Sequence, residues 1–219
     1  MNASAAPDRH HEAGSDTRRA LIAAAAREMH AHGFQAASLA GILADTGVTK
    51  GALYHHFPSK LDLGYAVFDE YYAPALRVNW IAPLQGDRGD ALTTLISVIS
   101  RVGEGMSEQD VALGCPVNNL AQEMSAVDAG FRARIEGLFD EWRRAIENGL
   151  DRLQRQGGLE AGVDTRSLAA FIVASLEGCL GMAKNAQRRD VMLECGKGLI
   201  AYLQSLRRRE PAGVGDRHA

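Results

Sequence analysis

The chain has 219 residues, with 24 Lys or Arg against 27 Asp or Glu, so its formal charge is -3 at pH 7. Hydrophobic residues at 46% and charged residues at 23% are typical of a globular protein and exclude a wholly disordered or collagen-like chain. Every strongly apolar stretch meets a charge before it reaches the roughly 20 residues of a bilayer span, and Glu177 interrupts the best candidate. We therefore expect no membrane span. Because charged residues near the N-terminus exclude a signal peptide, we expect a cytoplasmic protein.

The three cysteines, Cys115, Cys179 and Cys195, are odd in number and show no CxxC spacing. This pattern argues against both a disulfide framework and a structural zinc site. No other cluster has the spacing of metal ligands, and no glycine-rich loop is suited to cradle a phosphate. We expect neither a metal nor a cofactor.

Three short helices are predicted in the first sixty residues. Asp16 or Thr17 can cap the first helix, and Gly33 suits the left-handed position that ends it. Ser38 can cap a short second helix. A third helix, at 49–57, follows a glycine turn and stops before a proline, which cannot continue it comfortably.

Longer helices are predicted beyond residue 60, because apolar residues recur there at steps of three and four. We see no alternating strand and no internal repeat, so the predicted fold class is all-α. The polar, aperiodic ends of the chain, 1–15 and 207–219, are expected to be disordered. The predicted longer helices lie near 59–71, 92–102, 108–124 with an interruption at Pro116, 131–153, 165–187 and 192–206.

Positive charge is concentrated near the N-terminus. Residues 17–60 hold five basic and two acidic residues, a net +3, whereas residues 61–219 hold 18 basic and 22 acidic residues, a net -4. A basic module on an acidic body suggests a polyanionic partner. Two short helices joined by a tight turn form the helix-turn-helix, in which the second helix enters the DNA major groove.

The third helix of this module has a distinct inner and outer side. Leu53 and Phe57 are four residues apart and are predicted to point inward, which leaves Lys50, Tyr54 and His55 outside. Lysine supplies charge for a phosphate, and tyrosine supplies a hydroxyl donor and a flat ring. By spacing alone, a helical hairpin with a solvated polar face is an equally good interpretation.

The order of residues in this segment favours DNA binding. Gly33-Phe34, Ser38-Leu39, Ile42 and the run from Gly47 to Lys60, GVTKGALYHHFPSK, closely resemble the DNA-binding domain of the tetracycline-repressor (TetR) family. The resemblance implies an all-helical regulator with a DNA-binding domain at 16–62 and a ligand-binding and dimerisation domain at 63–206. Departures from the family pattern at Ala37, Leu43, Thr46 and Leu61 leave the recognition helix intact. Carried over by position, the residues at or near DNA are Ser38, Thr49, Lys50, Gly51, Tyr54, His55, His56 and Lys60.

The resemblance also implies a homodimer that pairs through its last two helices. Small residues in the segment 165–187 would let two helices approach closely. A dimer would present two recognition helices about 34 Å apart, so the operator should be a near-palindrome. An internal core helix is the alternative. The predicted interface residues are Phe171, Ala174, Ser175, Gly178, Cys179, Leu199, Tyr202 and Leu203.

The resemblance implies a small-molecule effector that relieves repression, but the sequence does not identify it. Aromatic residues could line an apolar pocket and amides could orient a ligand, although most of these residues also suit a plain core. The candidate ligand residues are Tyr71, Tyr72, Trp80, Cys115, Asn118, Asn119, Gln122, Phe131, Phe139 and Trp142.

Other functions compete with a ligand-released repressor. Cys115, at the start of a helical turn, could instead sense oxidants or electrophiles, and an inert buried thiol is the alternative. A helical enzyme would use Glu123, Asp128 or a histidine as acid or base, but no nucleophile and base have the required spacing. An activator or an architectural DNA-binding protein would carry the same reading helix.

Overall fold

The structure is a computed structural model that describes residues 9–86 and 89–208, and its described part is helical except for turns and one isolated bridge. The chain forms two compact units. The first comprises residues 1–76 and 115–138, and the second comprises residues 77–114 and 139–219. The segment 115–138 thus belongs to the unit of the N-terminal module, whereas the sequence suggested a single boundary after residue 62.

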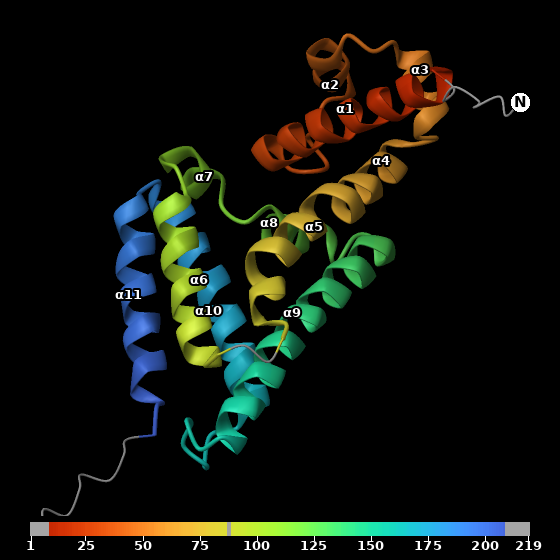
Figure 1. The fold of residues 1–219 in the computed structure, drawn as a ribbon. Helices are drawn as coiled ribbons and strands as arrows, with labels where there is room; N and C mark the ends of the chain where they lie inside the picture. Colours follow the sequence, from red (N-terminus) through yellow and green to blue (C-terminus); the bar gives the residue numbers. More distant parts are fainter. Residues whose placement is uncertain (1–8, 87–88, 209–219) are drawn as a thin grey trace, which may run out of the picture. The chain divides into compact units, whose positions relative to one another are not determined.

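The first unit contains the predicted helix-turn-helix and the helices that support it (Figure 1). Helix α1 packs against α2, α3 and α4. The elements are α1 (Arg9–His32), α2 (Leu39–Thr46), α3 (Lys50–His56), α4 (Lys60–Val67), the π-helix η1 (Phe68–Tyr72), α5 (Ala73–Leu76), α8 (Pro116–Met124) and the beginning of α9 (Ala129–Arg155).

The second unit is a bundle in which α11 packs against α6, α7 and α10 (Figure 1). The helical run that starts at Lys60 continues into this unit as far as Leu84, beyond the predicted end near residue 71. The elements are the π-helix η2 (Arg77–Ile81), the 3-10 helix η3 (Ala82–Leu84), α6 (Ala91–Gly105), α7 (Glu108–Leu113), the rest of α9, α10 (Thr165–Ala186) and α11 (Arg189–Ser205).

Local sequence signals set the helix ends between residues 32 and 50. The cap at Ser38 and the glycine turns were predicted, whereas Thr49, predicted as the first residue of its helix, is its N-cap. Ser38 and Thr49 are the N-caps of α2 and α3, and their side chains accept hydrogen bonds from the backbone nitrogens three residues later. Gly33 and Gly47 have φ values of 82° and 67°, the left-handed region that glycine occupies without steric cost. The predicted turn between α2 and α3 is therefore present.

The ordered part of the chain extends further toward both ends than predicted. Helix α1 begins at Arg9, not at Asp16 or Thr17, since no proline follows Arg9 and the single Gly14 costs a helix only about 1 kcal/mol. At the other end, Arg207 forms an isolated bridge with Leu159 and an ion pair with Asp90, which holds the chain beyond α11. The remainder of both predicted tails, 1–8 and 209–219, lies outside the described residues.

Two of the cysteines are paired, which corrects the expectation of no disulfide. Cys179 in α10 and Cys195 in α11 form a disulfide with a Cα–Cα distance of 5.7 Å. A two-residue turn joins these helices, so positions 16 residues apart in sequence face each other across the hairpin. Cysteine count and spacing cannot reveal a pair that the folding of two helices creates.

By length and composition, α10 could cross a membrane, although Glu177 lies within it. The sequence rule that any charge interrupts a span was therefore too strict. In the structure, α10 packs against α7 and α11, and Leu168, Ile172 and Glu177 are among its buried residues. A helix packed inside a protein passes the same test of length and composition, and one side of α10 is buried in this way.

Candidate nucleic-acid interface

Helix α3 is fixed to the first unit through its apolar side. Leu53 is fully buried, and Phe57, the C-cap residue, is 2% exposed. The guanidinium of Arg18 on α1 lies 5.1 Å from the centre of the Phe57 ring. Four residues separate the two anchors, so they occupy one face of the helix and orient the opposite face outward.

The outward face of α3 carries the residues predicted to meet DNA. Lys50, Gly51 and His55 are exposed, and Tyr54 is 40% exposed. The Lys50 Nζ lies 5.9 Å from the centre of the Tyr54 ring, a weak cation–π contact. His56 is half-buried, with its ring 5.5 Å from that of His55. The helix therefore presents a cation, a phenol and an imidazole together.

Lys50 differs from the other basic residues of the module. Among the described residues, Arg18, Arg19 and Arg27 form ion pairs with Glu70, Asp16 and Asp45 respectively, whereas Lys50 has neither an ion pair nor a hydrogen bond. An exposed ammonium without an internal partner is available to neutralise a phosphate. Most of the positive charge of residues 17–60 is therefore neutralised by ion pairs within the first unit.

Lys60 has a structural role. Its Nζ donates a hydrogen bond to the carbonyl oxygen of Gln35 at 2.9 Å and lies 5.2 Å from the centre of the Phe34 ring. These contacts join the start of α4 to the turn after α1. The sequence suggested only a DNA contact for Lys60, because a partner 25 residues away cannot be identified from local spacing.

The hydroxyl groups of Ser38 and Thr49 act first as helix caps. Their oxygens accept hydrogen bonds from Gly41 N and Ala52 N, both at 3.2 Å. Both residues are exposed, and an accepting hydroxyl keeps its own hydrogen to donate. Capping is therefore compatible with the predicted phosphate contacts at the start of α2 and α3.

The sequence did not predict how Glu123 supports the module. Its two carboxylate oxygens accept hydrogen bonds from the backbone nitrogens of Phe34, at 2.8 Å, and Gln35, at 2.7 Å. These nitrogens lie just beyond Gly33, at the end of α1. Glu123, on α8, thus holds the turn between α1 and α2 within the first unit, and it has a structural task in place of the acid or base role considered from sequence.

Asp128 caps the start of α9 in a similar way. Its Oδ1 accepts hydrogen bonds from Phe131 N at 2.7 Å and from the Tyr65 hydroxyl at 2.8 Å. Both bonds stabilise the ionised carboxylate, and they lower the pKa of Asp128 below its ordinary value. A carboxylate held in its charged form by donors is suited to connect α9 to α4, not to move protons.

The predicted ligand residues are divided between the two units. Tyr71, Tyr72, Cys115, Asn118, Asn119, Gln122 and Phe131 belong to the first unit, and Trp80, Phe139 and Trp142 belong to the second.

Several of these residues are core. The buried Tyr72 hydroxyl donates to Ala26 O at 2.7 Å, and burial raises its pKa. Phe131 is fully buried, with its ring 5.0 Å from that of Phe34. In the second unit, Trp142 is 1% exposed, and its ring lies 5.2 Å from that of Trp80.

The other candidates are more accessible. Tyr71 is 45% exposed, Gln122 is exposed, and Asn118, Asn119 and Phe139 are half-buried. Cys115 is half-buried at the N-cap of α8 and takes no part in the disulfide. In the described part of the chain, no group of three or more His, Cys, Asp or Glu side chains is arranged to hold a metal ion.

The residues predicted at a dimer interface divide into two groups. Cys179, Leu199 and Leu203 are at most 6% exposed and belong to the core of the second unit, so they offer little surface to a partner. They lie on the sides of α10 and α11 that face the bundle, which apolar periodicity alone did not distinguish from an outer face. Phe171, Ala174, Gly178 and Tyr202 are exposed and Ser175 is half-buried.

Both parts of the chain match known sequence families. Residues 21–67 match the family described as bacterial regulatory proteins, tetR family, and residues 91–198 match the C-terminal domain of LmrA/YxaF-like transcriptional regulators. The transcriptional regulator AcuR of Cereibacter sphaeroides is 31% identical over 172 residues, which cover 78% of each chain.

One further relative and one solved structure are also similar to this chain. The transcriptional repressor NemR of Escherichia coli is 29% identical over 142 residues, 61% of this chain and 69% of NemR. The crystal structure of a TetR transcriptional regulator from Chloroflexus aurantiacus matches with a TM-score of 0.79 at 28% identity, over 91% of this chain and all of the other.

Proposed function

The chain belongs to the TetR family of transcriptional regulators, and from that premise we propose that it is a homodimeric repressor of a near-palindromic operator, released by a small molecule. A member of this family is a transcription regulator and not an enzyme, so the enzyme hypothesis is set aside. Repression is favoured over activation because relatives such as NemR are named repressors. Binding to the cell's DNA requires a cytoplasmic protein.

The observation that carries the proposal is the outer face of α3. Buried Leu53 and Phe57 fix this helix, while Lys50 is exposed and has no ion-pair or hydrogen-bond partner in the described residues. We assign the phosphate contact to Lys50 and contacts at the groove to Tyr54 and His55. The hydroxyls of the two cap residues and the backbone at Gly51 extend this surface, with His56 at its edge.

We assign the contact between two copies to the exposed sides of α10 and α11. Phe171 is 51% and Tyr202 42% exposed, and their rings lie 5.4 Å apart. Ala174 and Gly178 continue the exposed face of α10 with small side chains, which permit close helix packing. Large aromatic residues beside small ones suit a self-complementary patch around a two-fold axis.

The effector is assigned to the helical body by family membership alone, and its chemistry is not part of this proposal. A thiol-based sensor at Cys115 is the second candidate. Cys115 takes no part in the disulfide and stands at the N-cap of α8, where a helix N-terminus favours a thiolate. If an electrophile still releases DNA from Cys115→Ser, this second candidate is wrong.

The test of DNA binding is a titration with the DNA that flanks the protein's own gene, at several salt concentrations. Lys50→Ala should weaken binding and reduce the slope of log affinity against log salt by about one, the effect of losing one phosphate contact. Tyr54→Ala should weaken binding with little change in slope. Arg155→Ala is the control, because it removes one exposed positive charge on α9 outside the module.

Unchanged affinity in both Lys50→Ala and Tyr54→Ala would refute the assignment of α3 as the reading helix. The dimer is tested separately by light scattering on the purified chain. A monomer that binds the operator as tightly as expected of a dimer would contradict the proposed pairing through α10 and α11.

A further inference from the structure

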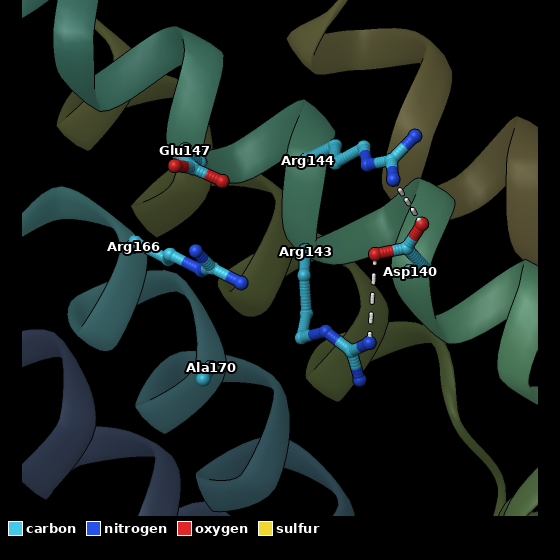
Figure 2. A pocket seen from close by; sticks show the side chains of 6 residues that line it. All are labelled: Asp140, Arg143, Arg144, Glu147, Arg166 and Ala170. Carbon is cyan, nitrogen blue, oxygen red and sulfur yellow. Dashed lines mark ion pairs between the residues drawn. The ribbon is translucent and has the colours of Figure 1, made fainter.

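A charged pocket lies between α9 and α10 in the second unit. Its volume is about 340 Å³, and none of its lining residues is assigned to DNA contact. This volume is large enough for several water molecules or one small metabolite. Figure 2 shows the side chains that line it. The lining residues are Asp140, Arg143, Arg144, Glu147, Arg166 and Ala170.

Three guanidinium groups share this pocket with two carboxylates, so the lining has a net charge of +1. This is unusual for the region, because residues 61–219 carry a net charge of -4. The Asp140 carboxylate lies between two of the arginines, 2.9 Å from Arg144 Nη2 and 3.6 Å from Arg143 Nη2 (Figure 2). One carboxylate therefore serves two guanidinium groups.

Arg166 is the cation that the pocket leaves uncompensated. It extends from α10 toward α9, and among the described residues its guanidinium has no ion pair or hydrogen bond (Figure 2). Arg166 also lies in the first turn of α10, where the helix dipole is positive and a cation is unfavourable. The N-cap Asp164 offsets part of this charge. An anion beside Arg166 would neutralise the remaining positive charge. It would also accept two parallel N–H hydrogen bonds from the guanidinium.

Glu147 determines what else the ligand must carry. Its carboxylate lines the same pocket and, in the described part of the chain, has no ion-pair or hydrogen-bond partner. A carboxylate only accepts hydrogen bonds, so it favours a ligand that also carries a hydrogen-bond donor, and a neutral hydroxyl donor leaves the ligand a monoanion. A monoanion balances the net charge of the lining, whereas a phosphate dianion would bring a second negative charge near Asp140 and Glu147.

We propose that this pocket binds a small hydroxycarboxylate, with the carboxylate on Arg166 and a hydroxyl on Glu147. The proposal depends neither on DNA binding nor on the proposed dimer. The other occupant to consider is an acidic side chain of a second copy, since Ala170 adjoins the exposed face of α10.

The test is calorimetric titration of the full chain with gluconate, and with its neutral isostere gluconamide. Gluconate should bind and gluconamide should not. Arg166→Ala should weaken gluconate binding at least tenfold, and Glu147→Gln should strengthen the binding of acetate by raising the charge of the pocket. Arg155→Ala, an exposed arginine of α9 that does not line the pocket, should bind gluconate as the unaltered chain does.

Circular dichroism and light scattering on each variant complete the test. The proposal is overturned if the unaltered, folded chain does not bind gluconate. It is also overturned if Arg155→Ala weakens binding as much as Arg166→Ala, which would indicate a general charge effect. If Arg166→Ala changes the oligomeric state but not the affinity for gluconate, the cluster belongs to an interface between copies and the ligand site is wrong.

Discussion

Replacement of Glu123 should detach α8 from the turn at the end of α1. Its carboxylate accepts two backbone hydrogen bonds, from Phe34 N and Gln35 N. The site is tight, because a Cβ added at Gly33, where φ is +82°, would lie 2.9 Å from Glu123 Oε2.

The magnitude follows from the two hydrogen bonds. A hydrogen bond to a charged group contributes about 1.5–3 kcal/mol, and half-buried groups lie at the lower end. Glu123→Ala removes both bonds, and because Glu123 is half-buried, water can satisfy part of what is lost, so the free energy of unfolding should fall by about 2–3 kcal/mol, at or just below the sum of two bonds at the lower end. Glu123→Gln keeps one acceptor but turns an amide NH2 toward the second backbone donor, so it should cost about 1–2 kcal/mol. For a chain of this size, the alanine variant should melt roughly 4–12 °C lower.

The assay is urea unfolding followed by circular dichroism, together with hydrogen exchange of the Phe34 and Gln35 amides. Both amides should exchange faster in Glu123→Ala, since each loses its acceptor. Glu104→Gln is the control, because this exposed glutamate has no side-chain hydrogen bond or ion pair in the described residues. If both Glu123 variants unfold within 0.5 kcal/mol of the unaltered chain, the usual range for a neutral surface change, the role given to this carboxylate is refuted.

Three further predictions test other contacts. The hydrogen bonds from Arg18 hold the pKa of Glu70 below its ordinary value of 4.5, so this pair should stabilise the fold at neutral pH and cease to do so as the pH falls through the lowered pKa. Glu70→Gln should therefore cost about 0.2–1 kcal/mol in urea unfolding at pH 7 and progressively less as the pH falls through the lowered pKa, and a cost that does not change with pH would contradict the pairing. Phe171→Glu should weaken dimerisation about thirtyfold or more in sedimentation experiments, the effect of losing an aromatic anchor, while unchanged dimers would move the interface elsewhere. Cys195→Ser opens a disulfide that spans 16 residues and should cost about 2–4 kcal/mol. Dithiothreitol should lower the melting temperature of the unaltered chain to that of this variant. If dithiothreitol lowers the melting temperatures of the unaltered chain and the variant equally, loss of the Cys179–Cys195 disulfide is not the cause.

Local signals in the sequence were enough to predict the helix-turn-helix of the first unit. Ser38 and Thr49 cap their helices through hydrogen bonds that span three residues, and Gly33 and Gly47 end helices by conformations that depend on one residue. Apolar spacing within α3 also predicted which side is buried. All of these interactions act within one or two helical turns, so the order of residues determines them.

Burial of an apolar stripe could be predicted, but its direction could not. Cys179, Leu199 and Leu203 have the same periodicity as the exposed Phe171, and the structure places the first three in the core. A stripe can face either its own bundle or a second copy, since both remove the same apolar area from water.

Tertiary structure alone decided the contacts between distant segments. Glu123 meets the backbone of Phe34 across 89 residues, and Lys60 meets the carbonyl of Gln35 across 25. The arginine pocket likewise requires Arg166 of α10 to face the acidic and basic residues of α9. The sequence determined the helices, their caps and the charge of the reading face through short-range hydrogen bonds and periodicity. Helix packing decided which charged side chains form ion pairs within the protein and which stay exposed. A side chain's partner depends on distance in space and not on distance along the chain.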